Sequence, residues 1–287
     1  MTPLLSKVRV SAAFITLTAL FVIGMNHVTA VADSPVATGA DAARNSVQTS
    51  ISLAVPYLER AGEAWIEKRQ CVSCHQVPFM LWSLSAAAEQ NYETDRERLG
   101  KWMAWSVDIR SFVKPDQKDD LVPATTLAAN IDTLSALLLG IPHQSRSDAT
   151  EQAEQGHWRR TFANALVENQ SDEGDWRSCG QLPAQKRPLK ETTQVTTAWA
   201  VLALQREGVS PEHEQTALST LQNDEPVSTE WWVVRLLLAD RLSDPQAAFF
   251  RQNLLARQHA DGGWGWLTED PSDALATGMA LYALCHH

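Results

Sequence analysis

Two stretches of the chain repeat the same order of residues, and this internal repeat limits the possible folds more than any other feature. Both place a Gln a few residues before a Gly and a Trp, one within residues 167–176 and the other within 256–266. In both, a polar loop follows and then a segment rich in Ala and Leu. These segments cover residues 196–204 and 276–284, with weaker copies at 132–139 and 230–238. A unit repeated in this way is typical of stacked helical hairpins.

Apolar residues recur every three or four positions after Ser50, and no long run of alternating apolar and polar residues interrupts them. This spacing places apolar side chains on one face of a helix. It also predicts a first pair of helices, over residues 55–69 and 78–89. We therefore expect an all-α protein.

The turns that contain Gln, Gly and Trp resemble the QW motifs of squalene and terpene cyclases and related prenyltransferases. The resemblance covers roughly residues 52–287, with good motif matches only in the third and fifth hairpins. It implies an α/α toroid of about five helical hairpins, in which inner helices line a cavity and the motif's Gln and Trp brace outer helices. Small residues such as Ala198, Ala203 and Ala280 agree with this, because they let inner helices pack closely. The helix predicted at 276–284 has no partner after it, which favours an incomplete ring or a longer parent chain.

Residues Cys71, Val72, Ser73, Cys74 and His75 form the attachment signature of c-type haem. Two thiols at this spacing can each form a thioether with one haem vinyl group, and the adjacent imidazole becomes an axial ligand of the iron. The sequence therefore predicts one covalent haem c, attached through Cys71 and Cys74, with His75 as an iron ligand.

The position of the motif follows from the repeat. Lys68-Arg69-Gln70 parallels Ala256-Arg257-Gln258, so the haem motif is expected to replace a turn between an outer and an inner helix. Three other interpretations stay open: a disulfide, a redox-active CxxC pair, and one half of a zinc site. A thioredoxin-like pair should follow a strand, and a zinc site needs a second pair of ligands, and neither is visible in the sequence.

The second axial ligand is not identified by the sequence. Met80 is only five residues from His75 and would not reach the opposite face of the porphyrin. The remaining candidates are Met103, His143, His157, His213, His259 and Met279. An open coordination position would favour ligand binding or peroxide chemistry over electron transfer.

The N-terminus predicts export. Lys7 and Arg9 precede an apolar run over residues 10–25, and small residues follow at Ala30 and Ala32, which is the pattern of a secretory signal peptide over residues 1–32. The run is shorter than the roughly 20 residues that span a bilayer, so no membrane span is expected after cleavage. Residues 33–51, rich in Ala, Ser and Thr, are predicted to be a flexible linker. We expect a periplasmic or secreted protein.

Charge indicates which partners are compatible with the chain. The formal net charge is −10, and removal of the signal with its two cations changes it to −12. The sequence contains no basic patch of the kind that predicts nucleic-acid binding. A negative surface favours a basic redox protein or another subunit as partner. In an exported protein, Cys179 and Cys285 could form a disulfide, but the sequence does not establish that they lie close together.

Enzymatic activity is left undecided. The Asp-rich segment that supplies the catalytic acid of the cyclases is absent, and no Asp-x-Cys element matches a prenyltransferase zinc site. Asp132, at the start of a predicted inner helix, is a weak candidate for a proton donor, and helix capping by Asp132 or Asn130 is the more economical explanation.

We expect an exported c-type haem protein on a cyclase-like toroid, with a redox or electron-transfer role. One alternative is a terpenoid cyclase-related enzyme or apolar-ligand binder without haem. The other is a non-catalytic, partner-binding toroid. The cavity wall discriminates between them, because a wet wall at Thr196, Thr197 and Thr277 favours binding or scaffolding and an aromatic wall favours an apolar ligand.

Overall fold

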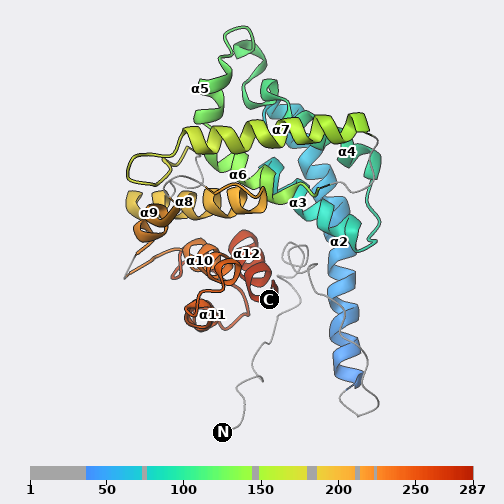
Figure 1. The fold of residues 1–287 in the computed structure, drawn as a ribbon. Coiled ribbons are helices and arrows are strands. Elements are labelled where there is room, and N and C mark those ends of the chain that lie inside the picture. The colour runs from blue at the N-terminus through green and yellow to red at the C-terminus, as the bar shows by residue number, and fades with distance from the viewer. Residues whose placement is uncertain are drawn as a thin grey trace. The chain divides into compact units, whose positions relative to one another are not determined.

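The structure, a computed structural model, describes residues 37–72, 76–143, 149–179, 186–210, 214–222 and 225–286. These residues form eleven α-helices and two short 3-10 helices, joined by turns (Figure 1). Pairing of the β type within them is limited to two isolated bridges, Ser228 with Leu267 and Trp264 with Asp273. The predicted all-α class is confirmed.

The described chain divides into two compact units, one containing residues 58–85 and 94–226 and the other containing residues 37–57, 86–93 and 227–286. Two helices have residues in both units: α2 (Ala37–Arg69) and α3 (Gln76–Glu89). The first unit holds α4 (Arg96–Val107), η2 (Ile109–Phe112), η3 (Pro115–Gln117), α5 (Pro123–Ala128), α6 (Ile131–Gly140), α7 (Ala149–Glu168), α8 (Leu189–Arg206) and α9 (Glu214–Thr220). The second holds α10 (Thr229–Leu242), α11 (Ala247–Ala256) and α12 (Ala274–Cys285).

The six predicted helices are all present, and most are longer than the sequence indicated. The segment predicted over 196–204 is the second half of α8, which begins at Leu189, and the segment at 230–238 extends to Leu242 in α10. Ser228 starts α10 as its N-cap, with its hydroxyl accepting from the Trp231 N–H at 3.3 Å. A capping hydroxyl satisfies one of the free N–H groups at a helix start, which explains why the helix begins there.

The start of α2 differs from the sequence analysis. Residues 37–51 are helical, although they lie within the segment predicted to be a flexible linker. Hydroxyls that favour turns in a free chain are instead bonded within the helix, Thr49 Oγ1 to the Asn45 carbonyl at 2.8 Å and Ser50 Oγ to the Ser46 carbonyl at 2.9 Å. Continuation of the buried face that starts at Ile51 explains the single long helix.

Small residues set the packing of the first unit. In it, α6 packs against α7 and α8, and Ala198, Ala200 and Ala203 of α8 are fully buried. A Cβ at Gly140 of α6 would lie 2.9 Å from the Cβ of Trp82, so the absence of a side chain lets α3 pack against α6. The predicted use of small residues between these helices is therefore confirmed for α8.

The two Gly-Trp turns have the same internal hydrogen bonds, which confirms the repeat. The indole N–H of Trp176 donates to the Leu166 carbonyl of α7 at 2.7 Å, and that of Trp264 donates to the Leu254 carbonyl of α11 at 2.8 Å. Both indoles are fully buried. Each turn is therefore tied back to the helix that precedes it.

The same turns are also tied to the helix that follows. The backbone N–H of Trp176 donates to Thr197 of α8 at 3.1 Å, and that of Trp264 donates to Thr277 of α12 at 2.9 Å. The Gln of each motif closes its own turn, with Gln170 Nε2 donating to the Gly174 carbonyl at 2.9 Å. In the other copy, Gln258 Nε2 donates to the Gly262 carbonyl at 2.8 Å. Gly174 and Gly262 both have a left-handed backbone, at φ of 84° and 89°, which glycine adopts without strain.

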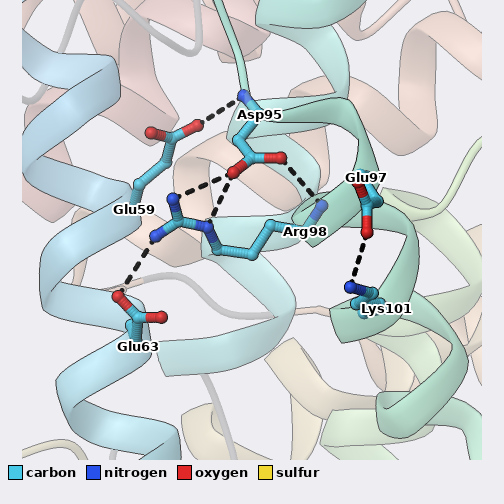
Figure 2. Close-up of polar contacts among 6 residues, drawn as sticks. All are labelled: Glu59, Glu63, Asp95, Glu97, Arg98 and Lys101. Atoms are coloured by element: carbon cyan, nitrogen blue, oxygen red, sulfur yellow. Dashed lines mark hydrogen bonds and ion pairs between the residues drawn. The ribbon is translucent and has the colours of Figure 1, made fainter.

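A charged network joins α2 to the start of α4 within the first unit (Figure 2). Arg98 pairs with Glu63 at 3.1 Å and with Asp95 at 2.9 Å. Asp95 is the N-cap of α4, and its own N–H donates to Glu59 Oε1 at 2.9 Å. The hydrogen bonds from the Arg98 backbone and side chain hold the pKa of Asp95 below its usual value.

None of the described helices combines the length and the apolar character that crossing a bilayer requires. The predicted signal peptide, residues 1–32, lies outside the described residues.

Candidate functional site

The haem motif lies in the connection between α2 and α3, between the two helices where the sequence analysis placed it. The first of them, α2, ends at Arg69, and Gln70 then turns the chain through a left-handed conformation at φ of 51°. The Gln70 N–H donates to the Ile66 carbonyl at 2.8 Å, which closes the last turn. Cys71 follows and is half-buried. The last three residues of the motif lie outside the described residues: Ser73, Cys74 and His75.

A backbone hydrogen bond fixes the first part of the motif to the rest of the first unit. The N–H of Val72 donates to the Ser111 carbonyl of η2 at 2.6 Å, and the Val72 side chain is fully buried. The adjacent Phe112 lies edge to face with Phe162 of α7, with 5.6 Å between the ring centroids. Cys71 is therefore the neighbour of an anchored, apolar segment that rests on an aromatic pair.

Two buried polar atoms near the motif have no hydrogen-bond partner. Ser111 is 2% exposed, and its hydroxyl oxygen has no partner in the structure. The same is true of the indole nitrogen of Trp65, which lies in the last turns of α2 under the guanidinium of Arg69, 5.2 Å from the ring centroid. Buried polar groups in proteins are nearly always satisfied, so such atoms favour a polar group or ligand that the structure does not contain.

The structure separates the candidates for the second axial ligand. Met103 on α4 and His157 on α7 belong to helices that contact the neighbourhood of η2, since α4 packs on η2 and α7 reaches it through Phe162. His143 interacts with Glu207 at 3.4 Å. Met80, excluded on sequence spacing, contacts Gly62 of α2.

Two of the remaining three candidates lie in the second unit. Both ring nitrogens of His259 have partners, Ser272 Oγ at 3.0 Å and the Thr268 carbonyl at 3.1 Å, and Met279 is buried. His213 lies outside the described residues. Met103 and His157 are thus the candidates whose helices contact η2, the element that anchors the motif.

Asp132 has structural partners, and Asn130 does not cap α6 through its side chain. Its Oδ1 accepts from the Thr196 hydroxyl at 2.7 Å, and its Oδ2 accepts from the Cys179 N–H at 2.8 Å. Asn130, at the N-cap position, makes no side-chain cap bond and donates instead to the Thr126 carbonyl at 2.8 Å. The carboxylate therefore links α6, α8 and the loop after Trp176.

The described cysteines are unpaired. Cys71, Cys179 and Cys285 each carry a free thiol, so the structure does not contain the Cys179 to Cys285 disulfide considered above. Desolvation raises the pKa of the Cys179 thiol, and the nearby Asp132 carboxylate raises it further. Burial also raises the pKa of the Cys285 thiol. Raised pKa values make both thiols poor nucleophiles at neutral pH.

The threonines proposed as a wet cavity wall are buried and bonded. Thr197 and Thr277 accept the Trp hydrogen bonds of the two turns, and Thr196 donates to Asp132. They therefore offer no wet wall. Aromatic side chains do meet in the first unit, where Trp82 lies 6.3 Å from both Phe79 and Trp199 between ring centroids.

A buried cation cluster at the end of α6 was not predicted. Arg159 donates to the Ile141 carbonyl at 2.5 Å and pairs with Glu207 at 2.6 Å, and Arg206 donates to the Leu139 carbonyl. Cations at a helix C-terminus bind its free carbonyls and interact favourably with the negative end of the helix dipole. Nothing in the local sequence marks these arginines, because their carbonyl partners come from a different helix. The buried hydroxyl of Ser111 was also missed, because its burial depends on segments distant in the sequence.

Among the described residues, no group of three or more His, Cys, Asp or Glu side chains is arranged to hold a metal ion. Comparison with protein-family models, with curated proteins and with solved structures gave no match.

Proposed function

We propose that the protein is an exported c-type haem protein with a redox or electron-transfer role, carried on a cyclase-like α/α toroid. The proposal rests first on the motif of Cys71, Cys74 and His75. The signal pattern at residues 1–32 supports it, because covalent haem attachment occurs in compartments outside the cytosol. The repeated Gly-Trp turns and the alternation of helices support the toroid.

The observation that carries the haem proposal is the anchoring of the motif beside an unsatisfied hydroxyl. The Val72 to Ser111 hydrogen bond fixes the chain next to Cys71, and the Ser111 hydroxyl is buried without a partner. A histidine that ligates a metal usually donates its other ring N–H to a nearby acceptor. Ser111 is a suitable acceptor in the described residues beside the motif, and Arg69 supplies a cation next to the motif for an anionic haem substituent.

In this proposal each residue has a defined role. Cys71 and Cys74 would hold the haem through thioethers, His75 would ligate its iron, and Met103 or His157 would be the first choice for a second ligand. When bound, the haem supplies one-electron exchange at iron. The net charge of −12 expected for the exported chain favours a basic redox protein as the electron partner.

The test is the visible spectrum and intact mass of the mature protein, produced in a host that matures c-type cytochromes. We expect a Soret band and the mass of one covalent haem, both lost in Cys71→Ala/Cys74→Ala. The control is Cys179→Ala, which removes another free thiol and should keep the haem. A colourless protein with the mass of the apoprotein would exclude the proposal.

A second candidate is supported by the aromatic contact of Trp82 with Phe79 and Trp199, of which Phe79 and Trp199 are half-buried. Aromatic walls favour an apolar ligand. Binding of an apolar fluorescent probe to the colourless double cysteine variant, and its loss in Trp199→Ala, would favour an apolar-ligand binder that needs no haem.

A further inference from the structure

An arginine is buried without a hydrogen bond in the second unit. Arg235 lies on α10, which packs against α11 (Figure 1). The residue is 8% exposed, its Nε is buried without a hydrogen-bond partner, and the described residues offer its guanidinium no ion pair. Its contacts are with aromatic rings, at 4.7 Å from the centroid of Phe250 and 5.7 Å from that of Trp231.

The charges around Arg235 do not neutralise it. Asp244 is the acidic group that acts on it electrostatically, but it is not within ion-pair distance, and its carboxylate accepts from the Gln246 N–H at 2.8 Å. Desolvation dominates and lowers the pKa of the Arg235 guanidinium. A buried charge is normally retained only with a partner, so this position favours an anion that the structure does not contain.

Two more hydrogen-bond donors lack an acceptor in the cluster that Arg235 forms with the aromatic rings of α10 and α11. The indole nitrogens of Trp231 and Trp232 are buried, and neither has a hydrogen-bond partner. Their rings lie 4.9 Å apart, and the guanidinium of Arg257 lies 3.9 Å above the centroid of Trp232. Every unsatisfied group in the cluster is therefore an N–H donor, and two of its members are cations. The complementary ligand is negatively charged and rich in acceptor oxygens.

An apolar surface adjoins these donors. Phe249 of α11 is 55% exposed, and its ring lies 5.5 Å from Phe250 and 6.3 Å from Trp232. Leu255, on the same helix, is 45% exposed. An exposed aromatic ring that continues a buried aromatic cluster is suited to contact the apolar part of a ligand.

We propose that the α10 and α11 pair of the second unit binds an amphiphilic anion, with a phosphate or carboxylate head at Arg235 and an apolar body against Phe249. The site is separate from the haem motif in sequence and lies in a unit that does not contain Cys71. It therefore goes beyond the proposed redox function and does not depend on it.

The test uses the full mature chain and three probes: dodecyl phosphate below its micelle concentration, inorganic phosphate, and the uncharged dodecyl maltoside. Isothermal titration calorimetry gives the affinity, and quenching of tryptophan fluorescence reports contact with Trp231 and Trp232. We expect dodecyl phosphate to bind, Arg235→Gln to weaken it about tenfold or more, and Phe249→Ala to weaken it less. Arg241→Gln, on the exposed face of the same helix, is the matched control and should bind normally.

The outcomes decide both parts of the proposal. Equal binding of inorganic phosphate would keep the anion site and exclude the apolar part, whereas equal binding of dodecyl maltoside would exclude the anion site. Failure of dodecyl phosphate to bind, or unchanged binding in Arg235→Gln, would overturn the proposal. Thermal unfolding of Arg235→Leu without probe adds a check on folding, since removal of a buried unpaired charge should raise the melting temperature.

Discussion

The carboxylate of Asp132 accepts the hydroxyl of Thr196 at 2.7 Å and the backbone N–H of Cys179 at 2.8 Å. The two bonds connect α6 to α8 and to the loop after Trp176, so a residue that the sequence suggested as a weak candidate for a catalytic acid has a structural role. Each carboxylate oxygen of Asp132 therefore holds one donor from a different segment of the first unit.

We expect Asp132→Ala to destabilise the protein by about 1–3 kcal/mol, because it leaves a backbone donor and a buried hydroxyl without their acceptor. Urea unfolding would measure the change. The control is Asp172→Ala in an exposed turn, which should change stability by less than about 0.5 kcal/mol. A stability of Asp132→Ala equal to that of the wild type would remove the structural role.

Two glycines with a left-handed backbone offer a second prediction. Gly174 and Gly208 both have positive φ, at 84° and 71°. A Cβ at Gly174 would lie 2.7 Å from the Ala217 nitrogen, whereas one at Gly208 would meet nothing within 4 Å. We expect Gly208→Ala to cost about 1–2 kcal/mol from backbone conformation alone, and Gly174→Ala to cost more. Thermal or urea unfolding would measure both variants. If they lost the same stability, the close contact at Gly174 would be relieved without a cost in free energy.

The Trp indoles of the two turns can be tested as a pair. Trp176→Phe and Trp264→Phe each remove one buried N–H donor and leave the carbonyl of Leu166 or Leu254 without it. We expect each variant to lose about 1–3 kcal/mol, measured by urea unfolding. The half-buried Trp105 makes no comparable bond in the described structure, and Trp105→Phe is the control. A loss in only one turn would mean that the two copies of the repeat are not equivalent in stability.

These turns show how far the sequence leads. The Gln, Gly and Trp spacing predicted equivalent turns because every partner lies in or beside the repeat. The all-α class and the six predicted helices followed from apolar spacing for the same local reason. The start of α2 at Ala37 was not predicted from apolar spacing. The segment before Ile51 is polar, and it is helical as the continuation of a helix whose buried face begins at Ile51.

The site was predictable in part. Cys71 could be placed between two helices because the residues before it parallel those before a repeated Gly-Trp turn. Its anchor on Ser111, 40 residues along the chain, and the unsatisfied donors around Arg235 depend on which distant side chains meet. No local pattern records such contacts, and the same holds for the Arg159 and Glu207 pair.

His143 gives a prediction on pH. Glu207 lies 3.4 Å away and would by itself raise the pKa of His143, but desolvation and the charges of Arg159 and Arg206 outweigh it and lower that pKa. A histidine with a lowered pKa in the folded state stabilises the protein above its unfolded pKa of about 6.5, and this contribution is lost as the pH falls through the folded value. Stability should therefore decrease as the pH is lowered below about 6.5.

The measurement is urea unfolding between pH 7.5 and pH 5, with His143→Gln beside the wild type. We expect the variant to lose part of this pH dependence, and the exposed His286→Gln to retain it. The ordinary titration of Asp and Glu, including the lowered pKa values of Asp95 and Asp261, acts at lower pH and should be common to all three proteins. A steeper pH dependence in His143→Gln would instead mean that attraction to Glu207 dominates and that the folded-state pKa of His143 is raised.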